Sequence, residues 1–531
     1  MIGKNLRWMA AIVLSANLCL ATTPGTLMAG QDGRTQDQAA SIPTTTPIKH
    51  VVVIFQENVS FDHYFGTYPN AANLEGETPF TPLPGTPSVN GFSPALVSSN
   101  PNGSAPVRLS PAQNYTCDMN HDYTPEQQAF DSGLMDKFPE FTSTSCSAST
   151  YPLIAPLGTQ IVMGYYDGNT ASGLWNYAQN FALNDNFYGT NFGPSTPGAL
   201  NVISGMTGNA DLKHSIDDSS GDLESDVVND SVIGDADPYY DDCGSPDQTS
   251  LKGKNIGNLL NEKRITWGWF QGGFTPSAVV NGKAQCKTTT NRLDGTAETA
   301  YSAHHNPFNY YASTANIHHT PPSSLKEIGH AGPANHQYDL SYFMAAASAG
   351  NLPAVSYLKA NRAQDGHPGN SSPLDEQAFI ATVINFLQSL PEWNSTAVFI
   401  TWDDSDGWYD HVVGPIVNQS TSVADGLTGV GACGIGTNSL AGLQSRCGYG
   451  PRIPLLVISL FAKQNFVDHT VSDQSSIVKF IEDNWSLGQI GNGSFDAVAG
   501  SVQNMFDFSR FNSEHVILDP HTGTVAKLSK E

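Results

Sequence analysis

The sequence predicts an α/β protein whose mostly parallel central sheet is flanked by helices and interrupted by long loop insertions. Short apolar runs rich in β-branched and aromatic residues recur along the chain, separated by amphipathic helical patterns. Such uninterrupted runs are typical of strands buried on both faces, as in parallel sheets. In addition, 49 glycines and 33 prolines among 531 residues indicate many turns and long ordered loops.

The strands and helices alternate along the chain. The predicted strands are 51–55, 265–270, 352–358, 397–402 and 453–460. The predicted helices are 125–137, 173–181, 255–262, 375–390 and 473–485, with a further helix that begins near Pro197. Residues 375–390 form the clearest helix, because apolar side chains recur at helical spacing from Phe379 to Leu390.

The charge balance bounds the partners. The formal net charge is −25, from 24 Lys and Arg against 49 Asp and Glu. This balance argues against nucleic acid as the main partner and disfavours attachment to anionic membranes. A small phosphate ester can still bind if a metal ion supplies local positive charge. The length suits one large domain, which we place at 48–531, although two or three domains are also compatible with it.

The N-terminus resembles an export signal. Lys4 and Arg7 precede the apolar run 9–20, so we predict a signal peptide at 1–30, followed by a polar, flexible leader at 31–47. An uncleaved, membrane-anchored N-terminus is the alternative. No later run is apolar enough to cross a bilayer, so we expect no transmembrane anchor in the mature chain. The predicted location is the periplasm or the medium.

Six cysteines remain after removal of the signal peptide, and an even number in an exported chain suggests disulfides. Each sequential pair brackets a loop-rich segment, which favours sequential pairing over the many other pairings. The predicted disulfides are Cys117–Cys146, Cys243–Cys286 and Cys433–Cys447.

Two long segments have the composition of insertions. Residues 70–111 are rich in Pro, Gly, Ser and Asn and lack periodicity. Residues 205–250 include the acidic stretch 211–242, which lacks the spacing of an EF-hand and is predicted to be a solvated surface loop. A C-terminal extension follows residue 486.

Two predicted strands end in oxygen-bearing side chains. Glu57 and Asn58 follow one strand, and Asp403 and Asp404 follow another. In open α/β sheets, ligands bind at the carboxyl ends of the strands. Adjacent carboxylates there repel each other unless a cation lies between them, and these donors suit Ca²⁺, Mg²⁺ or Mn²⁺. For Glu57 and Asn58 alone, capping of the next helix is the alternative.

A hydroxyl residue precedes the helix that begins near Pro197. Ser195 is predicted to lie at the helix N-terminus, where free N–H groups and the helix dipole favour an anion. A nearby divalent metal would lower the pKa of the Ser195 hydroxyl and prepare it to attack phosphorus. The alternative is an ordinary serine N-cap, which is the commoner role for such a motif.

The histidines divide into candidates and bystanders. The pair His304–His305 suits metal ligation or phosphate binding, although paired loop histidines are more often surface residues. His318 and His319 belong to no motif and are predicted to be surface residues. His63 and His411 lie within motifs but beyond the candidate ligands, so we predict a supporting or structural role.

Four sequence blocks together resemble one known family. ENVSFDHYFG at 57–66 resembles the signature ENxSFDHYFG of bacterial and plant phosphoesterases that include non-specific phospholipase C. GPSTP at 193–197, DGHP at 365–368 and WYDHV at 408–412 resemble its other blocks, in the same order, from about residue 48 to 485. The chain is most similar to the branch typified by bacterial acid phosphatase A.

The resemblance implies an alkaline-phosphatase-like α/β sandwich with one divalent metal ion. It implies that Ser195 is the nucleophile and forms a phosphoserine intermediate. The implied metal ligands are Glu57, Asn58, Ser195, Asp403 and Asp404. The implied shell around the phosphate comprises His121, His304, His305 and His367.

Two departures from the phospholipase pattern favour the phosphatase branch. Phospholipases of the family typically have Thr followed by x-Pro-Asn-Arg, whereas Gly198 and Ala199 stand here in place of Asn and Arg. Ser405 replaces a histidine of the block DEHGGFYDHV. We therefore predict an exported, metal-dependent acid phosphatase of broad specificity toward small phosphomonoesters. Its acid optimum would arise because protonated histidines hold phosphate and act as general acids.

Two other functions stay open at this stage. A phospholipase C or related phosphodiesterase could use the same residues on phospholipid head groups, and a large apolar lip would favour it. A catalytically silent surface protein could keep the fold for binding, although retention of every candidate ligand speaks against it.

Overall fold

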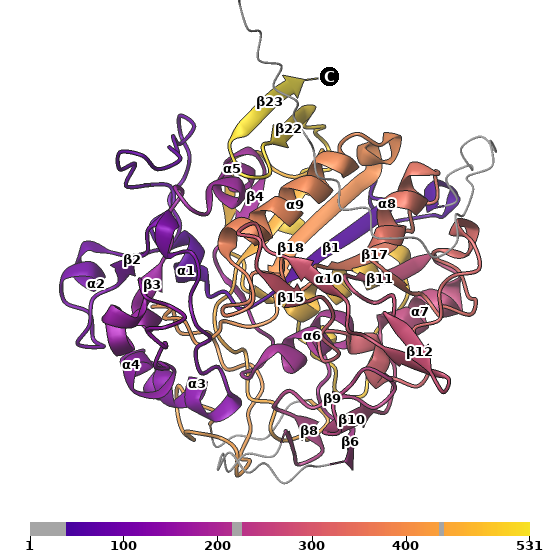
Figure 1. Cartoon of the computed structure of the whole chain (residues 1–531), viewed down its shortest axis with the longest axis horizontal. Coiled ribbons are helices and arrows are strands. Elements are labelled where there is room, and N and C mark those ends of the chain that lie inside the picture. The colour runs from indigo at the N-terminus through magenta and orange to yellow at the C-terminus, as the bar shows by residue number, and fades with distance from the viewer. Residues whose placement is uncertain (1–38, 215–225, 435–439, 531) are drawn as a thin grey trace, which may run out of the picture. The chain divides into compact units, whose positions relative to one another are not determined.

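An eight-stranded sheet forms the centre of the computed structural model, and β1 and β18 lie side by side within it (Figure 1). Only β19 runs antiparallel to its neighbours, so the sheet is mostly parallel. The strands, in order across the sheet, are β16 (Gln337–Asp339), β11 (Trp267–Gln271), β17 (Val355–Lys359), β1 (His50–Gln56), β18 (Thr396–Trp402), β19 (Leu455–Ser459), β4 (Ala182–Asn184) and β20 (Phe466–Asp468).

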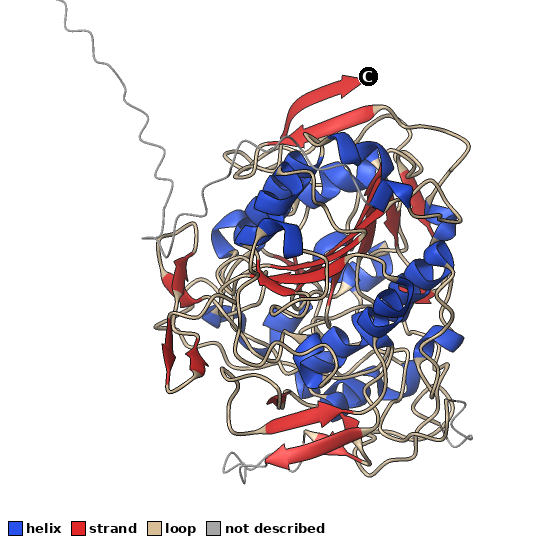
Figure 2. Ribbon diagram, turned by 90° about the vertical axis from the view of Figure 1, so that its right-hand side faces the viewer, coloured by secondary structure: helices blue, strands red, loops and turns tan. Residues whose placement is uncertain are grey.

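Helices cover both faces of this sheet (Figure 2). The α-helices of the described residues, some of them peripheral to the sheet, are α1 (Phe61–Phe65), α2 (Pro94–Ser98), α3 (Tyr123–Phe130), α4 (Phe138–Phe141), α5 (Ser172–Asn180), α6 (Ser195–Ser204), α7 (Ile256–Lys263), α8 (Ser341–Ser348), α9 (Pro373–Leu387) and α10 (Gln474–Trp485). Phe399 of β18 stacks near Phe480 of α10, whereas Trp402, three residues on, donates its Nε1–H to Glu376 of α9 (2.7 Å). Because side chains alternate along a strand, α10 and α9 lie on opposite faces.

The predicted α/β architecture is confirmed. Each of the five predicted strands is present in the sheet, with ends shifted by one to three residues. The helix predicted at 125–137 is the least accurate, because α3 ends at Phe130, where Asp131 adopts a left-handed backbone (φ 42°). Ser60 caps α1 and Asp473 caps α10, each accepting a backbone N–H as expected of N-cap residues.

Several smaller sheets are present besides the central sheet. One three-stranded sheet comprises β6 (Ala210–His214), β10 (Gln248–Leu251) and β9 (Asp237–Pro238). The two-stranded pairs are β2 (Val107–Arg108) with β3 (Gly164–Tyr165), β5 (Phe187–Tyr188) with β21 (Ser472–Asp473), β7 (Val227–Val228) with β8 (Ser231–Val232), β12 (Ala278–Val280) with β13 (Lys283–Gln285), β14 (Thr289–Asn291) with β15 (Ala297–Thr299), and β22 (Glu514–Leu518) with β23 (Val525–Lys530). Strand β22 packs on α9, so residues after 486 are anchored to the sheet layers.

The structure describes residues 39–214, 226–434 and 440–530, all within one unit of residues 35–531. The predicted signal peptide and residues 31–38 of the predicted leader lie outside these ranges. Within them, Thr45 and Thr46 hydrogen-bond to Asn484 of α10, so the end of the predicted leader lies against a helix. No helix in the described ranges has the length and apolar character needed to cross a membrane.

The three disulfides pair sequentially, as predicted: Cys117–Cys146, Cys243–Cys286 and Cys433–Cys447.

Candidate active site

Polar side chains meet at the carboxyl ends of β1 and β18. Gln56 and Trp402, the last residues of these strands, are direct neighbours in register. The Asp403 amide donates to the Gln56 carbonyl oxygen (3.1 Å), and the Asn58 amide donates to Asp403 Oδ1 (2.7 Å). Because parallel strands end at the same edge of a sheet, side chains from distant sequence blocks converge here. They are Glu57, Asn58, Asp403 and Asp404.

Helix α6 delivers Ser195 to this edge as its first residue. Ser195 Oγ lies 3.2 Å from Glu57 Oε2 and 3.2 Å from Asp404 Oδ2. The residue at the N-cap is Pro194, so the alternative of an N-capping Ser195 is wrong. Gly198 permits the close approach, because a Cβ at this position would lie 2.1 Å from the Asp403 carbonyl oxygen.

The carboxylates at this edge outnumber the cations that contact them. Glu57, Asp403 and Asp404 are all buried, and Lys359, the last residue of β17, contacts Glu57 Oε1 through its Nζ. Burial and the neighbouring Asp403 carboxylate raise the pKa values of Glu57 and Asp404 well above the ordinary range. One lysine therefore does not neutralise the group, and further positive charge would be stabilising.

Among the four strand-end residues Glu57, Asn58, Asp403 and Asp404, two buried oxygens accept no hydrogen bond from any described residue. They are Asn58 Oδ1 and Asp403 Oδ2. A buried acceptor without a partner costs about 1–3 kcal/mol, so such atoms call for a ligand. Carboxylate, amide and hydroxyl oxygens are the donors that Ca²⁺, Mg²⁺ and Mn²⁺ prefer, and the residues present fit a divalent cation of this kind.

Two further groups of close ligand atoms flank these oxygens. One comprises Glu57, His305 and Asp365, and the other comprises Asp118, His121 and Asp406. His305 Nδ1 lies 3.3 Å from Glu57 Oε1, and His121 Nε2 lies 3.9 Å from Asp404 Oδ2. The two histidines thus contact carboxylates on either side of Ser195.

A polar cavity of about 310 Å³ adjoins this cluster. All four histidines that the resemblance implied line it: His121, His304, His305 and His367. The other lining residues are Asp118, Asp235, Ser302, Arg362, Pro368, Gly369 and Asn370. Apart from Pro368 and Gly369, every lining side chain is polar or charged, which suits an anionic, hydrophilic ligand.

The histidines differ in their electrostatic surroundings. Burial by itself would lower the pKa of His304. The hydrogen bond to Asp237, with His304 Nδ1 3.3 Å from Asp237 Oδ1, and other nearby carboxylates outweigh burial, so the pKa of His304 is raised. Burial and the neighbouring His304 lower the pKa of His305 well below the usual range. One member of the pair therefore favours the protonated form and its neighbour the neutral form, as an acid and a neutral hydrogen-bonding group require.

Four buried residues near the site were not identified from the sequence. Lys359 and Asp406 contact the predicted ligands, and Asp365 lies near His305. Glu126 accepts hydrogen bonds from the Gly193 amide (3.0 Å) and Ser405 Oγ (2.7 Å), and its burial raises its pKa to about 7. The sequence did hold a signal for Lys359 and Asp365, because both follow a predicted strand. It held no signal for Glu126, because a position in a predicted helix does not indicate which residues the side chain contacts.

The acidic segment 211–242 is not a solvated surface loop throughout, so that prediction is wrong for its described C-terminal part. Asp241 is 3% exposed and accepts hydrogen bonds from Tyr301, Asn309 and His319. Because Tyr301 and Asn309 bracket His304 and His305, Asp241 helps hold the loop that carries both histidines.

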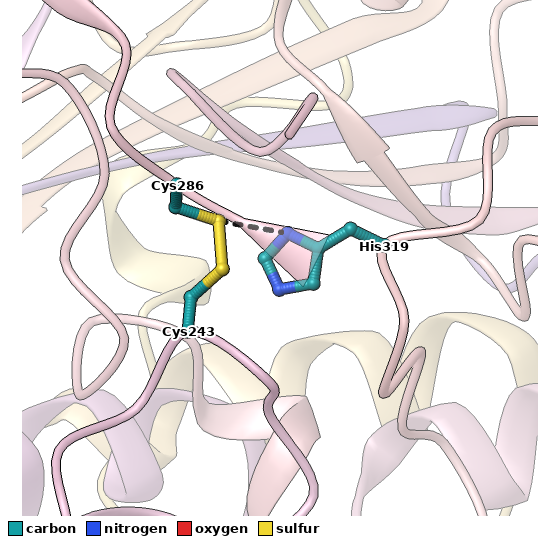
Figure 3. A group of neighbouring side chains, drawn as sticks. All are labelled: Cys243, Cys286 and His319. Atoms are coloured by element: carbon teal, nitrogen blue, oxygen red, sulfur yellow. Dashed lines mark hydrogen bonds between the residues drawn. A yellow bond between two sulfur atoms is a disulfide. The ribbon is translucent and has the colours of Figure 1, made fainter. Parts of the chain in front are cut away.

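His319 was also predicted wrongly, because it is buried. Figure 3 shows it beside the Cys243–Cys286 disulfide, with Nδ1 3.5 Å from Cys286 Sγ. Both sulfurs are bonded to each other, so this group offers no thiolate to a metal. His318 is exposed, as predicted.

The two motif histidines, for which a supporting or structural role was predicted, contact other residues of the motifs. His63 stacks on Trp408 (4.1 Å between ring centroids), and burial lowers its pKa to about 3. His411 Nδ1 lies 2.6 Å from Asp62 Oδ2.

A family model and several relatives match most of the chain. A model of the Phosphoesterase family matches residues 48–488. Non-hemolytic phospholipase C of Pseudomonas aeruginosa is 24% identical over 480 residues, which cover 88% of this chain and 58% of the relative. Phospholipase C B of Mycobacterium tuberculosis is 23% identical over 478 residues, which cover 87% of this chain and 78% of the relative. The chain thus spans little more than half of the Pseudomonas relative.

A solved structure described as a protein in the alkaline phosphatase superfamily from Vibrio parahaemolyticus also matches. It is 11% identical and aligns with a TM-score of 0.28 over 81% of this chain and 79% of its own. That score is too low to support an argument about fold.

Proposed function

The chain belongs to the phosphoesterase family, and we propose that it is a metal-dependent phosphatase that hydrolyses phosphomonoesters through Ser195. The observation that carries this proposal is the position of Ser195 Oγ, 3.2 Å from each of two buried carboxylates at a helix N-terminus. Two of the four histidines that line the cavity, His121 and His305, lie near the same two carboxylates as this hydroxyl. A nucleophile, an anion-favouring helix end and proton donors are the parts that phosphoryl transfer requires.

The proposed ligands of one divalent cation are Glu57, Asn58, Ser195, Asp403 and Asp404. When bound, the cation would act as a Lewis acid that lowers the pKa of the Ser195 hydroxyl and offsets charge on the phosphoryl oxygens. The unpartnered oxygens of Asn58 and Asp403 support this assignment.

The chain's own residues would carry out two displacements at phosphorus. Ser195 Oγ would give its proton to a carboxylate 3.2 Å away, on Glu57 or Asp404, and form a bond to phosphorus while the bond to the leaving oxygen breaks. A protonated histidine gives the leaving oxygen a proton. Water then gives a proton back to that histidine and attacks the phosphoserine, the bond between phosphorus and Ser195 Oγ breaks, and Oγ regains its proton from the carboxylate as phosphate is released. His304 is suited to the acid role, because its raised pKa preserves the protonated form. Activity would then fall as the pH rises through that pKa, which gives an acid optimum.

The lining of the cavity supports a monoester substrate over a phospholipid. Its volume of about 310 Å³ is at the lower end for ligand sites, and its side chains offer almost no apolar surface. A diacylglycerol leaving group would need apolar contacts that these residues do not provide. Small polar phosphomonoesters fit this chemistry.

The direct test is Ser195→Ala with an aryl phosphate as substrate and divalent metal present. We expect kcat to fall by roughly 1000-fold or more, because the group that attacks phosphorus is lost. The thermal unfolding midpoint should stay within a few degrees of that of the wild type. Near-normal turnover by the variant would remove Ser195 as the nucleophile.

Phospholipase C activity is the second candidate, because the relatives described above are phospholipases C. Hydrolysis of phosphatidylcholine, measured against the aryl phosphate on the same preparation, separates the two. Preference for the phospholipid would assign the chain to the second candidate.

We also infer that the chain is exported. Its three disulfides are typical of an oxidising compartment such as the periplasm or the medium. N-terminal sequencing of the mature protein tests the predicted removal of residues 1–30.

A further inference from the structure

Arg362 is the one arginine that lines the cavity beside Ser195, within the ranges that the structure describes. It lies on the loop after β17 and shares the cavity wall with His304, His305 and His367. Its backbone amide donates to the Ala300 carbonyl oxygen (3.1 Å). Its Nη2 donates to Asn370 Oδ1 (2.8 Å). Both the backbone and the guanidinium are therefore held in place at the cavity wall.

The guanidinium of Arg362 has no carboxylate within ion-pair distance among the described residues. This contrasts with Arg108, Arg292 and Arg452, each of which lies within 4 Å of one or more carboxylates. Arg264, Arg446 and Arg510 also lack such a carboxylate among the described residues, but none of them lines this cavity. A fixed guanidinium that lines a cavity and forms no ion pair within the protein is suited to an anionic ligand.

The two acidic residues of the cavity wall are occupied elsewhere. Asp118 Oδ1 lies 3.9 Å from His121 Nδ1. Asp235 Oδ1 accepts the Thr196 amide at the start of α6 (2.9 Å). Neither carboxylate forms an ion pair with Arg362, although His367 and Arg362 interact electrostatically with Asp118 at longer range. The guanidinium of Arg362 therefore remains available to a ligand in the cavity.

We propose that Arg362 is a specificity-determining residue that binds the phosphoryl oxygens of phosphomonoester dianions. This inference rests on the proposed function and names the feature of the substrate that is selected. A monoester loses its last proton with a pKa near 6 and then carries close to two charges on three oxygens, whereas a diester carries one charge on two oxygens. A planar guanidinium that donates two parallel N–H bonds gains more from the dianion. The cavity would therefore discriminate against diesters.

The test compares a monoester with a diester that has the same leaving group. We would measure kcat/KM for p-nitrophenyl phosphate and bis(p-nitrophenyl) phosphate near pH 7, where the monoester is largely a dianion, with divalent metal present. For Arg362→Gln we expect a loss of roughly 10- to 100-fold on the monoester and of less than roughly threefold on the diester. Arg362→Lys should recover part of the loss, because lysine keeps the positive charge but lacks the two parallel N–H donors of the guanidinium. Asn370→Ala removes the side chain that holds the guanidinium, so it should lower kcat/KM for the monoester relative to kcat/KM for the diester, by a smaller factor than Arg362→Gln does.

Arg264→Gln is the matched control, because it makes the same change in net charge at an exposed position after α7. It should leave both kcat/KM values unchanged. An equal loss on both esters in Arg362→Gln, or no loss on either, would overturn the proposal while leaving the phosphatase assignment intact. A wild-type protein that cleaves only the diester would refute the proposed function itself. Circular dichroism and the thermal midpoint check that each variant is folded.

Discussion

Two clusters of buried side chains, whose carboxylates come from the same two stretches, 57–62 and 403–410, balance their charge in opposite ways. We call Glu57, Asp403 and Asp404 the strand-end cluster, and Asp62, Asp410 and Arg452 the arginine cluster. All six residues are at most 3% exposed. The clusters differ in how the negative charge is balanced, and that difference separates a candidate site from a structural contact.

In the arginine cluster, the charges are paired within the protein. Arg452 Nε lies 3.1 Å from both carboxylate oxygens of Asp410, and its Nη2 lies 3.0 Å from Asp62 Oδ1. Its Nη1 donates to the carbonyl oxygens of Asn90 and Asp185. In the strand-end cluster, by contrast, Asp403 Oδ2 accepts no hydrogen bond from the part of the chain that the structure describes, and Lys359 is shared among several carboxylates. Burial of acidic side chains alone does not mark a site; unpartnered oxygens and excess negative charge do.

The largest expected effect follows from removal of metal. If a divalent cation balances the strand-end cluster, chelation followed by dialysis should lower phosphatase activity by roughly 100-fold or more. Titration with Ca²⁺, Mg²⁺ and Mn²⁺ should restore activity and raise the thermal midpoint, because a ligand that binds only the folded state stabilises it. Asp403→Asn is the matched variant, and it should weaken the response to metal. Full activity in the metal-free protein would show that the two clusters do not differ in this way.

The next effect is on stability. Arg452→Met removes the cation that both buried carboxylates contact and leaves Asp62 with His411 alone, so the free energy of unfolding should fall by about 3–5 kcal/mol. Urea unfolding measures the change, and Arg510→Met at an exposed position is the control. At a temperature where the variant is folded, kcat should stay within roughly tenfold of the wild-type value. A large loss of kcat without loss of stability would instead place Arg452 in the active site.

The smallest effect concerns Glu482, a buried carboxyl group that has another carboxyl group, Asp496, as its neighbour and is stabilised by holding a proton. Burial and the neighbouring Asp496 raise the pKa of Glu482 to about 9. Because this folded-state pKa lies above the unfolded value, the stabilisation is complete below about pH 4.5 and is lost as the pH rises toward 9. Glu482→Gln should therefore raise the free energy of unfolding at pH 8 by roughly 1–2 kcal/mol and change it little at pH 4.5. Urea unfolding at both pH values checks this, and an equal shift at both would contradict it.

Much of the fold was predictable because its signals are local. Buried parallel strands read as uninterrupted apolar runs, and amphipathic helices as a periodic pattern. The convergence of Glu57 with Asp403 followed from one further rule, that parallel strands end at a shared edge. The position of Ser195 followed from the proline two residues after it.

The failures concern groups whose surroundings come from other parts of the chain. Asp241 and His319 are 78 residues apart, and each is buried because the other is its partner. Nothing near either residue in the sequence distinguishes it from a solvated acid or a surface histidine. Arg362 was missed for the same reason. Whether its guanidinium is available to a ligand depends on whether a carboxylate from another part of the chain pairs with it.

The amino-acid order was thus sufficient for the α/β class, the sequential disulfides and the residues that end β1 and β18, since each depends on composition or spacing along the chain. Which carboxylates are paired, which oxygens lack a partner and which arginine faces the cavity depend on the packing of distant segments. Burial converts those through-space arrangements into large electrostatic differences, and these differences distinguish the strand-end cluster from the arginine cluster.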